Sequence, residues 1–217
     1  YVDVVCTALG AGIVTDAPAA CTIIGSTGMH MRAQTAADAV LNDELTGYVM
    51  CLPLPGMIAM LQSNMAATLN IDWALALAGD LAASFGAPQD RASLIARIDG
   101  WMAESTPGAL LYHPYISEAG ERGPFVNAAA RASLIGLSTR HRFPDVMRAV
   151  IEGLGLSARD CYAAMGDMPA ELRLTGGAAR STALRRVLGA AVGTRISSVS
   201  YCTSALSNCR VRSRSCA

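Results

Sequence analysis

The stretch that most constrains the fold is Glu171–Gly193, in which a strand, a glycine turn and a helix follow one another directly. It opens on Leu172-Arg173-Leu174, an alternating run of strand length. Gly176-Gly177 permits a sharp turn, because residues without a side chain adopt backbone angles closed to others. Ser181 can cap the next helix, whose apolar residues recur every three or four positions until Gly193 can end it. This order predicts a strand-turn-helix unit that a ligand can approach closely.

The start of the helix after Ser181 is expected to offer unpaired N–H groups and a partial positive charge to an anion or polar ligand. The same pattern also occurs in ordinary strand-to-helix connections. Whether this turn belongs to a nucleotide site therefore depends on the rest of the chain.

The composition favours a globular protein with a sizeable core and disfavours two classes of partner. Hydrophobic residues make up 52% of the 217, enough for one or two domains. Because 17 basic residues balance 17 acidic ones, the chain has no basic field for nucleic acid. Prolines and polar residues interrupt the apolar region 48–79, so no membrane span is expected. No basic leader with an apolar core opens the chain, which favours the cytoplasm over secretion.

The seven cysteines form no CxxC pair, and most of those before residue 200 lie in apolar runs. They are interpreted as buried free thiols of a reducing compartment rather than as disulfides or metal ligands. The three histidines lack acidic or sulfur partners at ligand spacing, so each is interpreted as structural and no protein metal site is predicted.

A second glycine turn lies near the beginning of the chain. Ala19–Ile24 is strand-like and leads into Gly25-Ser26-Thr27-Gly28, a hairpin-type turn with two hydroxyls. Such turns can cradle phosphate oxygens with backbone N–H groups without a lysine, although a plain glycine turn has the same sequence. Asp3, taken alone, is a helix cap or a surface acid.

The remaining pattern alternates strands and helices up to residue 197. Two strand-like runs in 46–61 precede a helix expected to start at Gln62-Ser63-Asn64, in which Met65, Leu69, Trp73 and Leu77 share a face. An amphipathic helix is expected within 86–104, a strand at Leu110–Tyr115, a polar loop at Ser117–Phe125 and a core helix over 144–165. Residues 198–217 show neither the helical nor the strand periodicity of apolar residues. They are interpreted as an irregular tail that is not necessarily native.

In this order, four segments resemble the motifs of the FGGY family of carbohydrate kinases over about residues 1–197. They are DVVCTALGAG, IIGSTG, YHPYISEAGERGPFVNAAARASLIGLS and LTGGAARSTALRRVLGAAVG. The resemblance implies an α/β fold of the actin/Hsp70-like (ribonuclease H-like) ATPase type, with a mixed sheet flanked by helices. It also implies that the chain is the C-terminal, nucleotide-binding domain, without the N-terminal domain that holds most sugar contacts in the family.

The resemblance assigns roles to particular residues. Asp3 would be the general base that takes a proton from the attacking hydroxyl. The ATP contacts would come from both glycine turns and from two further positions, of which Asp72 stands where the family often carries glutamine: Gly25, Ser26, Thr27, Gly28, Thr68, Asp72, Gly176, Gly177, Ala178 and Ser181. Glu121 and Arg122 match a GER loop motif and are interpreted as bracing that loop.

The implied activity is ATP- and Mg²⁺-dependent phosphorylation of a small polyol or sugar. Within the family, the segments ALGAGIVTDAPAACTIIGSTGMHM and LQSNMAATLNIDW most resemble those of members that act on erythritol, with xylulose-like pentuloses and keto-sugar acids as rival substrates. Two alternatives stay open: a nucleotide-binding regulator on the same fold, and a half-enzyme that is inactive on its own. Expected partners are the small substrate and a second copy in a homodimer, with neither nucleic acid nor membrane.

Overall fold

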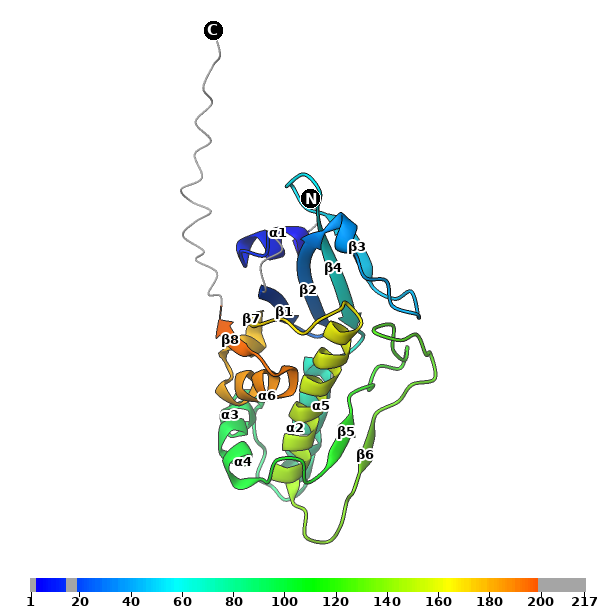
Figure 1. Ribbon diagram of the computed structural model, residues 1–217. Helices are drawn as coiled ribbons and strands as arrows, with labels where there is room; N and C mark the ends of the chain where they lie inside the picture. The colour runs from blue at the N-terminus through cyan, green and yellow to red at the C-terminus, as the bar shows by residue number, and fades with distance from the viewer. Residues whose placement is uncertain (1–2, 15–18, 199–217) are drawn as a thin grey trace.

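The computed structural model describes residues 3–14 and 19–198, which are built on a six-stranded mixed sheet (Figure 1). The strand order is β3-β4-β2-β1-β7-β8. Pairing is antiparallel from β3 to β1 and parallel from β1 through β7 to β8. The strands are β1 (Ala19–Ile24), β2 (Gly28–Thr35), β3 (Tyr48–Cys51), β4 (Met57–Asn64), β7 (Glu171–Thr175) and β8 (Arg195–Ser198). The expected mixed sheet is confirmed.

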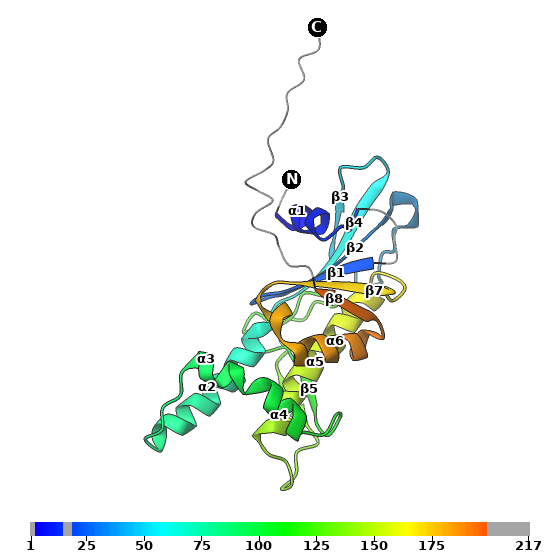
Figure 2. The same ribbon diagram turned by 90° about the vertical axis from the view of Figure 1, so that its left-hand side faces the viewer.

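Helices cover both faces of this sheet (Figure 2). Helix α1 lies on one face, and α5 and α6 lie on the other, with α2, α3 and α4 extending beyond them. Their bounds are α1 (Asp3–Gly10), α2 (Thr68–Ser84), α3 (Arg91–Ala96), α4 (Ile98–Glu104), α5 (Phe143–Ala163) and α6 (Thr182–Val192). A hairpin of β5 (Leu111–His113) and β6 (Ser133–Ile135) and two short 3-10 turns, η1 (Ala36–Asp38) and η2 (Gly177–Arg180), complete the described elements.

Strand β1 shows why this arrangement yields two cores. Successive side chains of a strand point to opposite faces, so Ala20 and Ile24 join the core with α5 and α6, while Ala19 and Cys21 join the core with α1. A strand that is buried on both faces has a mostly apolar sequence, and Ala19–Ile24 is apolar except for Thr22.

Helix α5 forms the centre of the larger core, as its periodicity predicts. Its buried residues include Met147, Val150, Ile151, Leu154, Ala158, Cys161 and Tyr162. Gly155 lets α6 approach closely, because a Cβ at this position would lie 2.9 Å from the Ala191 Cβ. Gly153 likewise lets β5 approach α5, because a Cβ at position 153 would lie 2.4 Å from the Tyr112 carbonyl oxygen.

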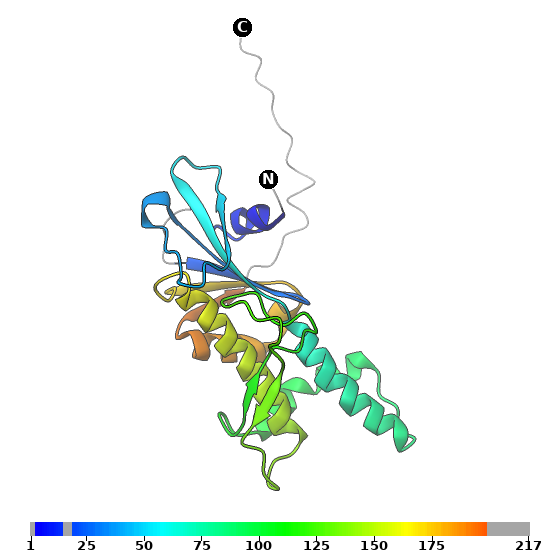
Figure 3. The same cartoon turned by 90° about the vertical axis from the view of Figure 1, so that its right-hand side faces the viewer.

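Two expectations about helices need correction. Helix α2 begins at Thr68 because residues 62–64 complete β4, where Asn64 pairs with Gly28. The apolar row of α2 is exposed along the helix and at its C-cap: Leu69, Trp73, Leu77, Leu81 and Phe85. Figure 3 shows α2 extending from the body. Within this row the Trp73 ring stacks on Tyr112 of β5, with the ring centroids 6.3 Å apart. The single helix expected in 86–104 is two helices that meet at Arg97.

Other expectations meet a mixed outcome. Cys21 and Cys161 are buried free thiols, whereas Cys6 and Cys51 are free but exposed, contrary to the interpretation. Of the expected tail, Ser198 belongs to β8, and residues 199–217 lie outside the described residues. No helix of the described part of the chain is long and apolar enough to cross a bilayer.

Candidate nucleotide site

The two glycine turns lie side by side at one edge of the sheet. Strands β1 and β7 run parallel, with Ile23 opposite Thr175, so both turns follow the carboxyl ends of neighbouring strands. Gly176 has a φ of +93°, and a Cβ there would lie 2.7 Å from the Ile24 carbonyl oxygen. A residue with a side chain cannot adopt this conformation at this distance without strain. The turn therefore depends on glycine at position 176.

Backbone hydrogen bonds join the first glycine turn to the start of α2. The Ala67 N–H donates to the Ser26 carbonyl oxygen at 2.7 Å, and the Thr68 N–H donates to that of Gly25 at 3.0 Å. Among the described residues, the N–H groups of Ser26 and Thr27 donate to no protein acceptor. The turn thus presents free donors, as a group that binds phosphate oxygens must.

Beside these turns is a cavity of about 550 Å³, open to solvent. Its apolar lining comes chiefly from Ile24, Ile71, Ile95, Ile98, Ile151 and Leu184. Five of the predicted ATP residues also line it: Gly25, Thr68, Asp72, Gly177 and Ser181. The other five, Ser26, Thr27, Gly28, Gly176 and Ala178, belong to the adjoining turns but not to the lining; the side chain of Ala178 lies outside the described structure. The volume and the apolar walls suit a nucleoside.

Two of the charged side chains in the lining are paired with each other. The Arg91 Nη2 and Nε donate to Asp72 Oδ1 at 2.6 Å and 3.0 Å, which links α3 to α2 beside the cavity. The pair is partly exposed and adds little stability. Its consequence is that the Asp72 carboxylate already has a protein partner. The sequence could not reveal this contact, because the two residues are 19 positions apart.

The expectation of free N–H groups at the start of α6 is wrong for two of its donors. The Leu184 N–H donates to Ser181 Oγ at 3.2 Å, as the predicted cap requires. The Ala183 N–H donates to Asp99 Oδ1 at 3.2 Å. Asp99 comes from the first turn of α4 and also lines the cavity, together with Arg180. Neither was predicted as a site residue; no motif or spacing in the sequence distinguishes them.

Asp3 lies apart from this cavity lining. It is the exposed first residue of α1, and its Oδ1 accepts a hydrogen bond of 2.8 Å from the Val4 N–H. Helix α1 packs on the sheet face opposite α5 and α6. The described structure does not join Asp3 to this cavity, so its role as general base stays a prediction.

The sequence matches the model of the FGGY family of carbohydrate kinases, C-terminal domain, over residues 20–206. This chain belongs to that family. It is 62% identical over 193 residues to the erythritol kinase of Brucella abortus, covering 88% of this chain and 37% of that protein. It is 28% identical to the xylulose kinase of Escherichia coli over 186 residues, 83% of this chain and 35% of the relative. The chain thus spans well under half the length of these relatives.

Solved structures of sugar and polyol kinases share the fold. The xylulose kinase of Rhodospirillum rubrum superposes with a TM-score of 0.74 at 22% identity, covering 90% of this chain and 37% of that one. A glycerol kinase of Plasmodium falciparum, solved with ADP, gives a TM-score of 0.73 at 17% identity over 90% of this chain and 38% of that one. The fold is accordingly the actin/Hsp70-like ATPase fold expected from the sequence.

A buried polar network supports the first glycine turn of this FGGY domain. The Asn64 amide nitrogen donates to the Gly123 carbonyl oxygen at 2.7 Å, so its Oδ1 faces His30 Nε2 at 3.0 Å. His30 Nδ1 lies 3.0 Å from the hydroxyl of Thr22. A Cβ at Gly28 would lie 3.2 Å from Asn64 Oδ1, so the turn rests directly on this network. His30 is structural, as the sequence indicates.

Glu121 of the GER loop has the bracing contacts predicted for it. The Met65 and Arg122 N–H groups each donate to its Oε1 at 2.8 Å, and the residue is 3% exposed. Burial raises the pKa of this carboxyl, while the backbone donors lower it. Because Met65 lies between β4 and α2, the contact ties the loop to the segment that leads from the sheet to the nucleotide cavity.

The buried histidine predicts a pH-dependent stability. Burial lowers the pKa of His30 to about 4 from 6.5, although the hydrogen bond with Asn64 opposes the shift. Between pH 4 and pH 6.5 the imidazole of His30 is protonated in the unfolded chain but not in the folded chain. The free energy of unfolding therefore falls as the pH drops from 6.5 to 4, by up to about 3 kcal/mol. Urea unfolding at several pH values should show this slope in the unaltered chain and in His113→Gln, whose histidine is exposed. His30→Gln should lose it; an unchanged slope would contradict the assignment.

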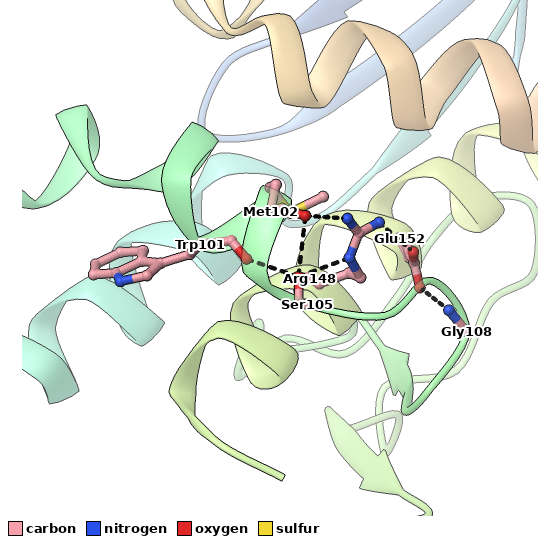
Figure 4. Close-up of polar contacts among 6 residues, drawn as sticks. All are labelled: Trp101, Met102, Ser105, Gly108, Arg148 and Glu152. Atoms are coloured by element: carbon pink, nitrogen blue, oxygen red, sulfur yellow. Dashed lines mark hydrogen bonds and ion pairs between the residues drawn. The ribbon is translucent and has the colours of Figure 1, made fainter.

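An arginine on α5 holds the end of α4, the helix that carries Ile98 and Asp99 of the cavity (Figure 4). Arg148 donates from Nε to Ser105 Oγ at 2.8 Å, from Nη1 to Glu152 at 3.1 Å, and from Nη2 to the Met102 carbonyl oxygen. Glu152 in turn accepts from the Gly108 N–H at 3.0 Å. These contacts tie α5 to the last turn of α4 and to the segment that follows it.

Arg148→Met should therefore destabilise the chain and loosen the cavity. The substitution keeps the apolar stem of the side chain but removes charge-assisted hydrogen bonds at a largely buried position. It should lower the free energy of unfolding by about 2–4 kcal/mol. Urea unfolding measures that loss, and calorimetric titration should show weaker ATP binding because α4 is no longer fixed. Arg140→Met removes an exposed arginine and should change neither quantity; a similar loss in both variants would contradict this account.

Proposed function

We propose that this chain is the nucleotide-binding part of an ATP-dependent kinase that phosphorylates a small polyol, with erythritol as the substrate. The observation that carries the proposal is the pair of glycine turns at the edge of an apolar cavity. The 62% identity to a protein named erythritol kinase supports erythritol, and the 28% identity to a xylulose kinase keeps a pentulose as the alternative.

The cavity residues would divide the work of binding ATP. The isoleucine walls would take the base and exclude water from its faces, while Ser181, whose hydroxyl proton is free, could donate to a ring nitrogen. The Ser26 and Thr27 N–H groups, with the Thr68 hydroxyl, would hold phosphate oxygens. Phosphoryl transfer depends mainly on such positioning and on neutralised charge.

Asp3 is the proposed general base. Its carboxylate would accept the proton of the substrate hydroxyl as that oxygen attacks the terminal phosphorus of ATP. Asp3 is exposed in this chain. Its carboxylate is therefore accessible to a substrate that another part of the enzyme would bind. Because the chain spans 37% of the related kinase, we expect it to bind ATP but not to turn over alone.

Mg²⁺ enters the proposal as the partner of the ATP phosphates, where it would neutralise their charge. In the described part of the chain, no group of three or more histidine, cysteine, aspartate or glutamate side chains could hold a metal. The enzyme is further proposed to work in the cytoplasm, to form a homodimer, and to need neither nucleic acid nor membrane.

A coupled assay of ADP release tests the activity. The protein that joins this chain to a preceding sugar-binding domain should consume ATP with erythritol and respond more weakly to xylulose and gluconate. Preference for xylulose would move the assignment to the alternative. ATP binding without turnover on any member of the panel would instead favour a nucleotide-binding regulator.

A further inference from the structure

The apolar row of α2 is a large exposed surface that the proposed roles leave unused. It consists of five side chains spaced by four residues: Leu69, Trp73, Leu77, Leu81 and Phe85. Trp73 is partly covered, because its ring stacks on Tyr112 of β5. Exposure then rises along the helix, from 51% at Leu77 through 62% at Leu81 to 81% at Phe85. The second half of α2 therefore carries an apolar surface against which a partner could pack.

The size of this row suits an interface between two copies of the chain. A large apolar side chain has roughly 150–250 Å² of surface, so the exposed fractions of the row amount to about 500 Å². Two copies that cover each other's row would bury about 1,000 Å² before flanking contacts are added, and a specific protein interface needs about that area.

The charges of α2 disfavour an anionic membrane or an acidic partner. Asp72 and Asp80 are the only charged residues of the helix, so it has no lysine or arginine to meet lipid headgroups. Asp72 pairs with Arg91. Asp80 is exposed, but successive residues of a helix are rotated by about 100°, so it lies beside Leu81 and not within the row. An acid in that position fits the polar rim of an apolar interface.

The shape of the surface is complementary to itself. Side chains spaced by four residues form a ridge on a helix, and the positions beside them form grooves. The grooves of α2 are lined by small residues, Ala76 and Ser84 on one side and Ala78 and Ala82 on the other. Two such ridges can interdigitate with the helices crossing at about −50°. A twofold axis through the contact gives both copies the same surroundings, which closes the assembly as a dimer.

The row lies far from the place at which a preceding domain would join the chain. Helix α1 is the first described element and lies toward one end of the molecule, whereas the free end of α2 is at the other (Figure 2 and Figure 3). A sugar-binding domain that precedes α1 would have to extend past the whole sheet to cover the row. A second copy can reach it directly.

We propose that two copies of this chain associate through the apolar row, with their α2 helices crossing about a twofold axis near Leu81. The inference rests on the proposed homodimer and assigns its surface, and it depends neither on ATP binding nor on turnover. It also accounts for large apolar side chains that the core of one copy does not use.

Sedimentation velocity of the 217-residue chain at micromolar concentrations tests the proposal. The unaltered chain should sediment as a dimer. Leu81→Glu places a carboxylate against the same group of the partner and should raise the dimer dissociation constant by at least about 100-fold. The matched control is Leu41→Glu, in the segment between η1 and β3, where the side chain is similarly exposed at 69%. This control should leave the dimer intact.

A pair of opposite charges separates loss of the interface from loss of the fold. Leu81→Lys alone should also be monomeric. An equimolar mixture of Leu81→Glu and Leu81→Lys should dimerise again, because opposite charges then face each other across the axis. A dimer that persists in Leu81→Glu, a dimer lost in Leu41→Glu as well, or a mixture that stays monomeric would overturn the role of the row. A monomeric unaltered chain would overturn the homodimer with it, while the coupled assay of ADP release would still decide the kinase activity.

Discussion

Asp3→Asn should lower kcat by about 10²–10⁴ in a kinase that joins this chain to a sugar-binding domain, the usual scale for losing a positioned base. The amide keeps the shape of the side chain and can still accept from the Val4 N–H, so α1 should stay folded. The KM for ATP should change little, because Asp3 does not line the nucleotide cavity.

Steady-state kinetics with erythritol as the varied substrate measure this effect. The matched control is Asp43→Asn, an exposed acid in the segment between β2 and β3, which should leave kcat unchanged. Full turnover by Asp3→Asn would remove Asp3 from the mechanism without affecting the nucleotide assignment. A rise in the KM for ATP without a fall in kcat would mean that Asp3 acts in nucleotide binding instead.

Gly176→Ala should strongly destabilise the domain. Its Cβ would lie 2.7 Å from the Ile24 carbonyl oxygen, and its φ of +93° disfavours any side chain. Strain of this kind together with overpacking costs about 2–5 kcal/mol. If the chain still folds, the two turns must separate, and ATP binding should weaken with them.

The neighbouring glycine supplies the control for this prediction. Gly177 has an ordinary φ, and a Cβ there would meet nothing within 4 Å, so Gly177→Ala should change the unfolding free energy by no more than about 0.5 kcal/mol. Urea unfolding of both variants makes the comparison. Equal stability of the two would show that the close approach of β1 and the β7 turn is not what requires glycine.

The sequence allowed the local units of the site to be predicted, because each has a short-range cause. Glycines between apolar runs mark the turns at Gly25 and Gly176, and Ser181 marks a helix start. The parallel pairing that places these turns together joins strands about 150 positions apart. Only the resemblance to a family, and not any spacing, indicated it.

Contacts between distant elements could not be predicted in this way. Spacing shows that Leu69, Trp73 and Leu77 share a face, but not that this face stays exposed. Likewise, nothing near Asp99 in the sequence indicates that α6 begins beside it and takes one of its oxygens. Charged side chains such as Asp72 and Arg91 are frequent on helices, so their pairing is visible only in three dimensions.

The most direct test of the central claim is to map ATP onto the chain by ¹H–¹⁵N NMR. Titration with ATP should shift amide signals of Gly25, Gly177 and Ile98, which line the cavity, and of Ser26 in the adjoining turn. The signals of β3 and β5 should stay in place. Shifts confined to other surfaces, or no shifts at millimolar ATP, would contradict the assignment of this cavity as the nucleotide site.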